Sequence, residues 1–303
     1  MNQTLLRYIR IFLLTLLGVG GGSVSVWGQT SIQDFGTGTG SWANQTGTTT
    51  FIPNPTSGTT WARSGNTAAT ATINLANTLN PLGTTGSYLR AVASSNGSVC
   101  KFYTWVGYTG STEFYTSFKI LFGDASAGST ANSGIWTFYQ GSGAMYNDVN
   151  DFVSNQVFTG LRFTYGASGA LALTYRAGNS WINTNFTTSS FNQATVYTIE
   201  IVGNNKTSGT ISYTYNGAAQ TVAVQKFDLF INGTLIGDDL AEAQLPANTS
   251  IASGTFIGIS STSNVANVFV DDVTVYNSVP AALGIATSLL VTPTSLSGFT
   301  YVQ

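Results

Sequence analysis

Short runs of alternating apolar and polar residues, separated by Gly, Asn and Ser, recur along almost the whole chain. Residues 195–202 show the pattern clearly, because Tyr197, Ile199 and Ile201 alternate with more polar neighbours. Such alternation predicts a β-strand with one buried face. Similar runs lie at 32–35, 69–75, 88–93, 99–106, 113–122, 135–139, 161–165, 170–176, 209–215, 222–224, 227–231, 255–260 and 268–276. We therefore expect a protein made almost entirely of short strands.

The segments between these runs contain residues that are typical of β-hairpin turns. Asn-Gly pairs stand at 216–217 and 232–233, and a Gly-rich loop stands at 166–169. One weak helical candidate is seen, at 238–245, where Asp238 and Asp239 would cap the helix. Parallel α/β folds need crossover helices, which this sequence does not provide. The pattern predicts an all-β, two-sheet antiparallel jelly-roll sandwich.

Composition narrows the functional classes. Charged residues make up 7% of the 303 residues, and the net charge is −2. Because phosphate neutralisation by Lys and Arg dominates nucleic-acid affinity, we expect no nucleic-acid partner. The chain has one cysteine and no histidine, so it has no internal disulfide and the core must hold the fold. Cys100, in an apolar run, is expected to be a small buried side chain.

The two ends differ from the middle of the chain. Arg7 and Arg10, a short apolar run, and Val26 and Gly28 before Gln29 predict a helical signal peptide at 1–28. A membrane anchor is the alternative, but the apolar core is short for a bilayer. We expect the sandwich at 29–278, and at 279–303 a linker and the start of a truncated β module. The protein is predicted to be secreted or on the cell surface, with no membrane contact after signal cleavage.

Two motifs in the last third of the chain resemble a known superfamily. Residues 227–234, FDLFINGT, resemble the xLYVNGxL hairpin of laminin-G-like and concanavalin A-like jelly rolls. Residues 269–276, FVDDVTVY, resemble the IDDVRVY closing strand of the same superfamily and of carbohydrate-binding modules. The low charge and abundant Thr, Ser, Asn and Gly are similar to surface proteins of the Bacteroidetes. The resemblance implies a lectin-like fold more than a particular function.

Catalytic residue types are scarce. The three glutamates are Glu113, Glu200 and Glu242, and none stands in the Glu-x-Asp-x-x-Glu pattern of glucanases in that superfamily. Glycoside hydrolysis needs two carboxyl groups across the scissile bond. Glu200 is the best single candidate, but we expect it to be an exposed strand residue. Without histidine, a Ser-His-Asp triad and a His-type zinc site are excluded. The sequence predicts a non-catalytic protein.

Calcium is the one metal that these residue types favour, because it takes oxygen ligands. In related carbohydrate-binding modules an ion lies between the N-terminal segment and the closing strand, which implies Asp34 with Asp271 or Asp272. Adjacent strand residues point to opposite faces, so one of the two would serve; the hypothesis is a structural calcium at Asp34 and Asp272. The alternative is that one of them accepts hydrogen bonds from loop amides. The acidic loop 147–151 is a second candidate, although Asx turns use such runs more often. No other cofactor is predicted.

Sugar binding usually needs an exposed aromatic ring with amides around it. The predicted ligand-binding residues are Trp181, Asn179, Asn183 and Tyr146, with Asn185 and Tyr108 as further candidates. Most other aromatics are expected in the core because they bury large apolar areas. Trp105 and Trp136, inside strands, are assigned there, whereas Trp42 and Trp61 could take either role.

Three functions fit the sequence. The first is a non-catalytic, carbohydrate-binding or lectin-like module with a glycan or cell-surface polysaccharide as partner. The second is a structural or adhesive spacer of a larger surface protein, without a small ligand. The third, a divergent glycoside hydrolase or lyase, would need a second acid facing Glu200. An exposed aromatic cluster distinguishes the first from the second.

Overall fold

The computed structural model describes residues 30–43, 46–47, 51–63, 72–93, 100–123, 134–143, 154–184, 186, 191–259 and 266–284. The predicted signal peptide, Tyr146, the loop 147–151, Asn185 and most of 279–303 lie outside these ranges, so the predicted domain limits stay predictions. For Cys100, Trp61 and Trp105 only the backbone is described. Within the described ranges no helix has the length and apolar character needed to span a membrane.

The larger of two stacked sheets has nine strands, in the order β17-β16-β13-β8-β19-β6-β5-β2, with β1 paired to β19. Its neighbours along this path are antiparallel. The strands are β1 (Thr30–Gln33), β2 (Gly40–Ala43), β5 (Thr72–Ala76), β6 (Tyr88–Val92), β8 (Glu113–Phe122), β13 (Val196–Asn204), β16 (Lys226–Ile231), β17 (Thr234–Ala241) and β19 (Asn267–Tyr276).

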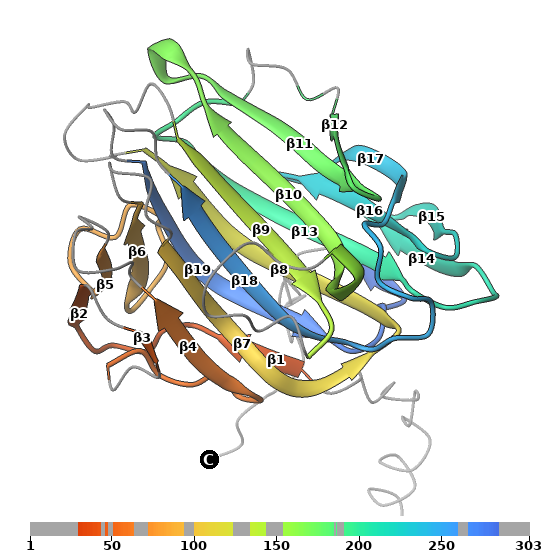
Figure 1. The fold of residues 1–303 in the computed structure, drawn as a ribbon, viewed down its shortest axis with the longest axis horizontal. Coiled ribbons are helices and arrows are strands. Elements are labelled where there is room, and N and C mark those ends of the chain that lie inside the picture. The colour runs from red at the N-terminus through yellow and green to blue at the C-terminus, as the bar shows by residue number, and fades with distance from the viewer. Residues whose placement is uncertain are drawn as a thin grey trace, which may run out of the picture.

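The second sheet has eight antiparallel strands in the order β12-β11-β10-β9-β18-β7-β4-β3. Figure 1 shows this sheet as the front layer and the nine-stranded sheet behind it. Its strands are β3 (Thr46–Gly47), β4 (Thr59–Arg63), β7 (Cys100–Ser111), β9 (Ile135–Gly141), β10 (Val157–Tyr165), β11 (Leu171–Ala177), β12 (Ser180–Asn183) and β18 (Ile251–Ile259). The two layers form the predicted antiparallel jelly-roll type sandwich, so the fold class is confirmed.

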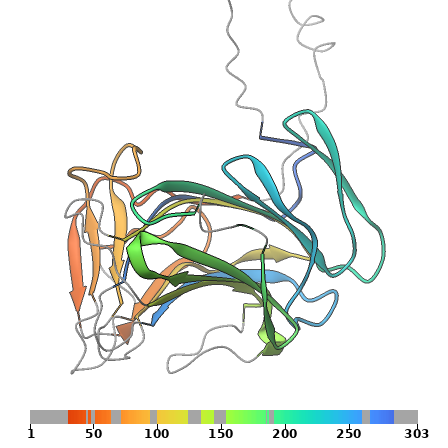
Figure 2. The same cartoon turned by 90° about the horizontal axis from the view of Figure 1, so that it is seen from above.

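A small sheet lies beside the two main layers (Figure 2). It consists of β14 (Ile211–Tyr215), β15 (Ala218–Val222) and β20 (Ala282–Leu283), in the order β15-β14-β20. Two 3₁₀ turns, η1 (Ser154–Gln156) and η2 (Ala167–Gly169), flank β10. The small sheet packs on the outer face of the nine-stranded sheet, where its Tyr213 and Tyr215 join Val202 and Phe230 in an apolar cluster of their own.

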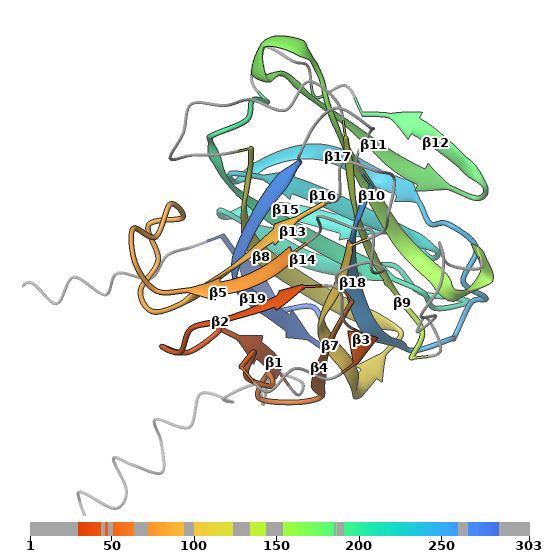
Figure 3. The same cartoon turned by 60° about the vertical axis from the view of Figure 1, so that its left-hand side comes forward.

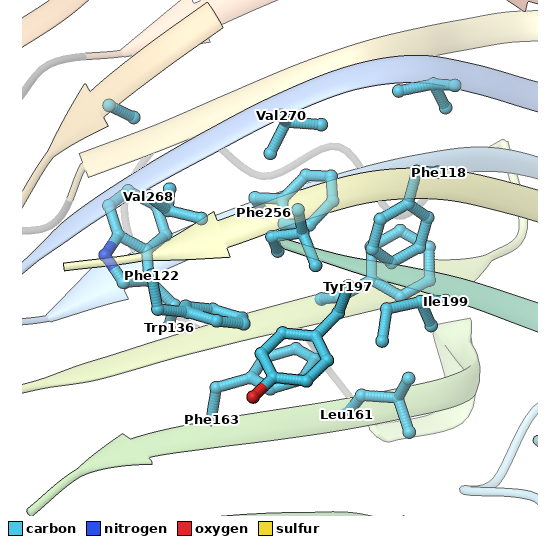
Figure 4. Packing of buried hydrophobic residues seen from close by; sticks show 14 of the residues in the cluster. Phe118, Phe122, Trp136, Leu161, Phe163, Tyr197, Ile199, Phe256, Val268 and Val270 are labelled. Atoms are coloured by element: carbon cyan, nitrogen blue, oxygen red, sulfur yellow. The ribbon is translucent and has the colours of Figure 1, made fainter. Parts of the chain in front are cut away.

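Aromatic side chains from both sheets fill the interior (Figure 4). The ring centroid of Phe118 on β8 lies 4.9 Å from that of Phe138 on β9 and 5.2 Å from that of Phe256 on β18. Trp136, assigned to the core from the sequence, is fully buried there. The alternation of β13 is confirmed, because Tyr197, Ile199 and Ile201 belong to this core while Val202 belongs to the outer cluster.

Both Asn-Gly pairs form the predicted hairpins. Asn216 and Gly217 have φ angles of 50° and 81° between β14 and β15, and Asn232 and Gly233 have 49° and 79° between β16 and β17. Two consecutive positive φ angles are the signature of the tight turn that matches strand twist. The loop at 166–169 also joins two paired strands, β10 and β11, as expected.

The predicted helix at 238–245 is wrong. Asp238 and Asp239 lie in strand β17, which pairs with β16, and the segment that follows has no helix. Asp239 does not cap a helix; its carboxylate accepts a hydrogen bond from the amide of Ala223 at 2.7 Å. Pairing with β16 outweighs the weak local helix propensity of this short segment.

The packing predicts that Phe118→Ala destabilises the sandwich by about 3–5 kcal/mol, the usual cost of deleting a buried phenylalanine ring. The measurement is urea unfolding followed by tryptophan fluorescence. Leu79→Ala is the control, since Leu79 is 94% exposed and should change the unfolding free energy by about 0.5 kcal/mol or less. A Phe118→Ala protein as stable as the Leu79→Ala protein would show that this ring is not a core residue.

Candidate functional site

Two rows of side chains cross the outer face of the eight-stranded sheet at its β12 edge, which Figure 3 shows beside β11. In the strand registers Tyr139 is opposite Gly160 and Arg176 is opposite Trp181. These four residues form the first row. The second row is Thr137, Arg162, Thr174 and Asn183. Because strand side chains alternate between faces, these outward residues are separate from Phe163 and Leu173, which belong to the core.

The first row depends on the absence of a side chain at Gly160. A Cβ atom there would lie 2.9 Å from the Cβ of Arg176 and 3.1 Å from the Tyr139 ring. Glycine normally weakens a strand interior and often marks a place of close approach. Here it leaves room for Arg176 to reach over β10, where its Nη1 lies 3.5 Å from the Tyr139 hydroxyl as a hydrogen-bond donor.

Trp181 lies on the edge strand β12 and packs against side chains of both rows. The guanidinium carbon of Arg162 lies 3.7 Å from the centroid of the Trp181 ring, and that of Arg176 lies 5.9 Å away. The Tyr139 ring is 6.2 Å from the same ring, tilted by 49°. Stacked cations favour a fixed orientation of the indole by attraction to its π face. We call Tyr139, Arg162, Arg176, Trp181 and Asn183 the Trp181 platform.

The structure brings some of the predicted ligand-binding residues together. Trp181 is half-buried on the platform, and Asn183 is exposed two residues further along the same face of β12. Asn179 is exposed in the turn that precedes β12. Tyr108 was expected on a loop, but it lies in β7 and is buried in the core. Trp42 is half-buried against the core.

The sequence reasoning missed Arg162, Arg176 and Tyr139. They come from three different strands, and only the pairing of β9, β10, β11 and β12 makes them neighbours of Trp181. Gly160 directly precedes the predicted run at 161–165 and lies inside β10 in the structure, where a glycine often marks a close approach of neighbouring groups.

Glu200 does not lie on an exposed strand surface as expected. It is 7% exposed, because the small sheet covers the outer face of β13 at this point. Its carboxylate accepts hydrogen bonds from the hydroxyl of Tyr115, at 2.7 Å, and from the hydroxyl of Tyr215. Burial, reinforced by the neighbouring carboxylate, raises the pKa of both tyrosines, so both keep their protons. Both of these partners are tyrosines, not the second carboxyl group that glycoside hydrolysis requires.

A second acid-tyrosine pair holds the same small sheet. The Tyr213 hydroxyl donates to Asp228 at 2.5 Å, and the Asp239 amide donates to the other oxygen of Asp228 at 2.8 Å. Tyr213 and Tyr215 are two residues apart on β14 and therefore share a face. Each tyrosine thus bonds one acid of the nine-stranded sheet, Asp228 on β16 or Glu200 on β13.

The predicted calcium ligands are already engaged. Asp34 is exposed and accepts a hydrogen bond from the amide of Gly36 at 3.1 Å, and Asp272 lies 3.0 Å from the ammonium of Lys119. Asp271 is buried and accepts from the Thr84 hydroxyl and from the amide of Asp272. In the described part of the chain no three His, Cys, Asp or Glu side chains gather as a metal site. Asp34 and Asp272 each have a local partner of their own, and the structural calcium stays a prediction.

Charge is divided between the two main sheets. Within their strand bounds, the eight-stranded sheet carries only basic charged residues, and the nine-stranded sheet carries an excess of acids. The basic residues of the first are Arg63, Lys101, Arg162 and Arg176. The second has Glu113, Glu200, Asp228, Asp238, Asp239, Asp271 and Asp272 against Arg90, Lys119 and Lys226. The strands of the two sheets therefore favour ligands of opposite charge.

Comparison with known proteins gives distant likenesses. No protein-family model and no curated protein matches the sequence. Among solved structures, an alginate lyase, Aly36B, is similar over 82% of this chain and 97% of its own, with 13% identity and a TM-score of 0.46. The Emp47p carbohydrate recognition domain covers 85% of this chain and all of its own, with 13% identity and a TM-score of 0.42. A botulinum neurotoxin type C structure covers 83% and 48%, with 14% identity and a TM-score of 0.45.

Two buried acids and one half-buried acid predict a protein that is more stable in mild acid than at neutral pH. Burial raises the pKa of Asp228 and of Asp271 from 3.8 to about 6, and that of Glu242 from 4.5 to about 7. The folded state therefore binds protons more tightly than the unfolded state. The stability gained from this is complete below the unfolded pKa values and is lost as pH rises through about 6 to 7. The melting temperature should fall between pH 4.5 and pH 7.5.

The matched variant is Asp228→Asn, which replaces one titrating carboxyl group by an amide of similar size and shape. Its melting temperature should depend less on pH than that of the unaltered protein. A melting temperature that rises with pH over this range, or an equal slope in the variant, would contradict the assignment.

Proposed function

We propose that the protein binds carbohydrate at the Trp181 platform, as a non-catalytic module of the concanavalin A-like type that the sequence motifs resemble. The observation that carries the proposal is the half-buried Trp181 ring, fixed at a sheet edge by Arg162 and Tyr139. An orientated aromatic ring packs on the apolar face of a sugar, and its rigidity lowers the entropy lost on binding. Asn179 and Asn183, exposed beside it, supply amide donors and acceptors for sugar hydroxyls.

The preferred sugar under this proposal is acidic. Two of the four basic residues on the eight-stranded sheet stand next to Trp181, and the strands of that sheet carry no acid. Arginine recognises carboxylates through paired N–H groups, which neutral sugars lack. A uronate-containing polysaccharide therefore fits the platform better than a neutral glucan.

The same charge pattern argues against hydrolysis at this surface, since two carboxyl groups are required and the described strands here provide none. A purely structural or adhesive spacer is the alternative, and it predicts no glycan affinity.

The test measures binding of an oligogalacturonate and of a neutral cello-oligosaccharide to the full chain by titration calorimetry. The acidic sugar should bind more tightly, and its affinity should fall as salt is added. Trp181→Ala should weaken it about tenfold or more, the loss of roughly 1.4 kcal/mol of ring contact. Arg162→Gln should weaken the acidic ligand more than the neutral one.

The matched control is Ile182→Ala, the neighbouring residue of β12, which is 41% exposed on the opposite face of the strand. It should leave both affinities unchanged. Absence of binding to either sugar, or unchanged binding by Trp181→Ala, would reject the platform and favour the spacer.

A further inference from the structure

A pocket on the opposite side of the sandwich is not used by the proposed function. It lies where the small sheet meets the outer face of the nine-stranded sheet and has a volume of about 490 Å³, within the roughly 300–1,000 Å³ typical of small-ligand sites. Its lining includes Tyr115, Glu200, Tyr215, Asn216, Asn232 and Gly284. We call it the Glu200 pocket.

Hydrogen bonds fix the polarity of this pocket. The hydroxyl protons of Tyr115 and Tyr215 point to the Glu200 carboxylate, so both hydroxyl oxygens keep acceptor lone pairs, and the Ser117 side chain bonds that of Tyr115. The Glu200 carboxylate accepts these two hydrogen bonds, whereas a carboxylate can accept about four. The Tyr215 ring is held by stacking on Phe230, with centroids 3.8 Å apart and planes 9° apart. The pocket floor is therefore a fixed cluster of acceptors around one carboxylate.

The charge of this floor is not balanced by a basic side chain. The ion pairs found among the described residues are Lys119 with Asp272 and Lys206 with Glu113, and neither includes Glu200. The surrounding strands carry the acidic excess of the nine-stranded sheet. A ligand with a negative charge would be repelled, whereas a cationic donor would both neutralise the carboxylate and satisfy its remaining lone pairs.

The walls add neutral hydrogen-bonding groups. The Asn232 side-chain oxygen accepts a bond from the Thr198 amide at 2.8 Å, which orients the amide so that its nitrogen is a donor. Asn216 stands on the β14–β15 turn, and its backbone N–H donates a hydrogen bond to the Leu283 carbonyl at 3.0 Å. Gly284 must lack a side chain here, because its φ is 72° and a Cβ would lie 2.5 Å from the Asn216 side-chain oxygen.

From this arrangement we infer that the Glu200 pocket binds a primary ammonium group, with Glu200 as its counter-ion and Tyr115 and Tyr215 as acceptors. The ammonium group has three donors and no acceptor, which complements an acceptor-rich floor. Asn216 and Asn232 bind hydroxyl groups attached to the same ligand. Two sources share this chemistry, an amino sugar and a simple alkyl amine.

The experiment measures the affinity of the full chain for glucosamine and for 1,5-diaminopentane by titration calorimetry. N-acetylglucosamine and glucose serve as ligands without the positive charge. Glucosamine should bind, and the two neutral sugars should bind about tenfold more weakly or not at all. Binding of both amines identifies the ammonium group alone as the ligand; binding of glucosamine only identifies an amino sugar.

The variant is Glu200→Gln, which keeps the size of the side chain and removes its charge. It should weaken glucosamine about tenfold or more. Asp228→Asn is the control, because Asp228 bonds Tyr213 of the same small sheet but does not line the pocket. Asp228→Asn and Trp181→Ala should both leave glucosamine affinity unchanged, which separates this site from the proposed function.

Two results would overturn the inference. Equal affinity for glucose and glucosamine would overturn it. This comparison uses the unaltered protein and therefore does not depend on whether Glu200→Gln folds. Unchanged glucosamine binding by a folded Glu200→Gln protein would do so as well.

Discussion

Contact between the aromatic inner faces of the two main sheets is the interaction on which this structure depends. The chain has one cysteine and cannot form an internal disulfide, and the ion pairs found in its described part lie at the surface. Surface pairs contribute little to stability. Burial of rings such as Phe118, Phe138 and Phe256 must therefore supply most of the favourable free energy. A few polar contacts also cross this interior. The Gln140 amide nitrogen on β9 lies 2.8 Å from the Thr116 hydroxyl on β8, and the Tyr165 hydroxyl on β10 donates to the Asn267 carbonyl on β19.

Because that interior excludes charge, charged side chains such as Arg162 and Glu200 lie on the outer faces of the two sheets. Each strand of the sandwich has one face committed to packing and one face available for other contacts. On β10 the committed face carries Leu161 and Phe163, and the outer face carries Arg162. On β13 the committed face carries Ile199 and Ile201, and the outer face carries Glu200. With charged residues at 7% of the chain, the separation of bases and acids between two sheets sets the sign of the field on each side.

The sequence predicted those features that depend on local pattern. Strand alternation identified the inward residues of β13, and Asn-Gly pairs identified two hairpins, since each is encoded within a few residues. It was wrong where distant segments meet. Glu200 looked exposed because the strands that cover it, β14 and β20, lie further along the chain. Tyr215 of β14, which bonds Glu200, is 15 residues away in sequence. Asp238 and Asp239 looked like a helix cap because nothing near them in sequence shows that they lie at an irregularity in the β16–β17 pairing, where Asp228 accepts a bond from the Asp239 amide.

The candidate sites show the same division. Trp181 could be selected from the sequence as an aromatic residue beside several asparagines, but Arg162, Arg176 and Tyr139 become its neighbours only through the pairing of four strands. Their roles follow from the register, since a shift by one residue would turn Arg162 inward and Phe163 outward. Gly160 is part of that register, because it must lie between Tyr139 and Arg176, where a Cβ atom would meet both. The core therefore determines the platform: the burial of Leu161 and Phe163 leaves Gly160 and Arg162 no other face to occupy.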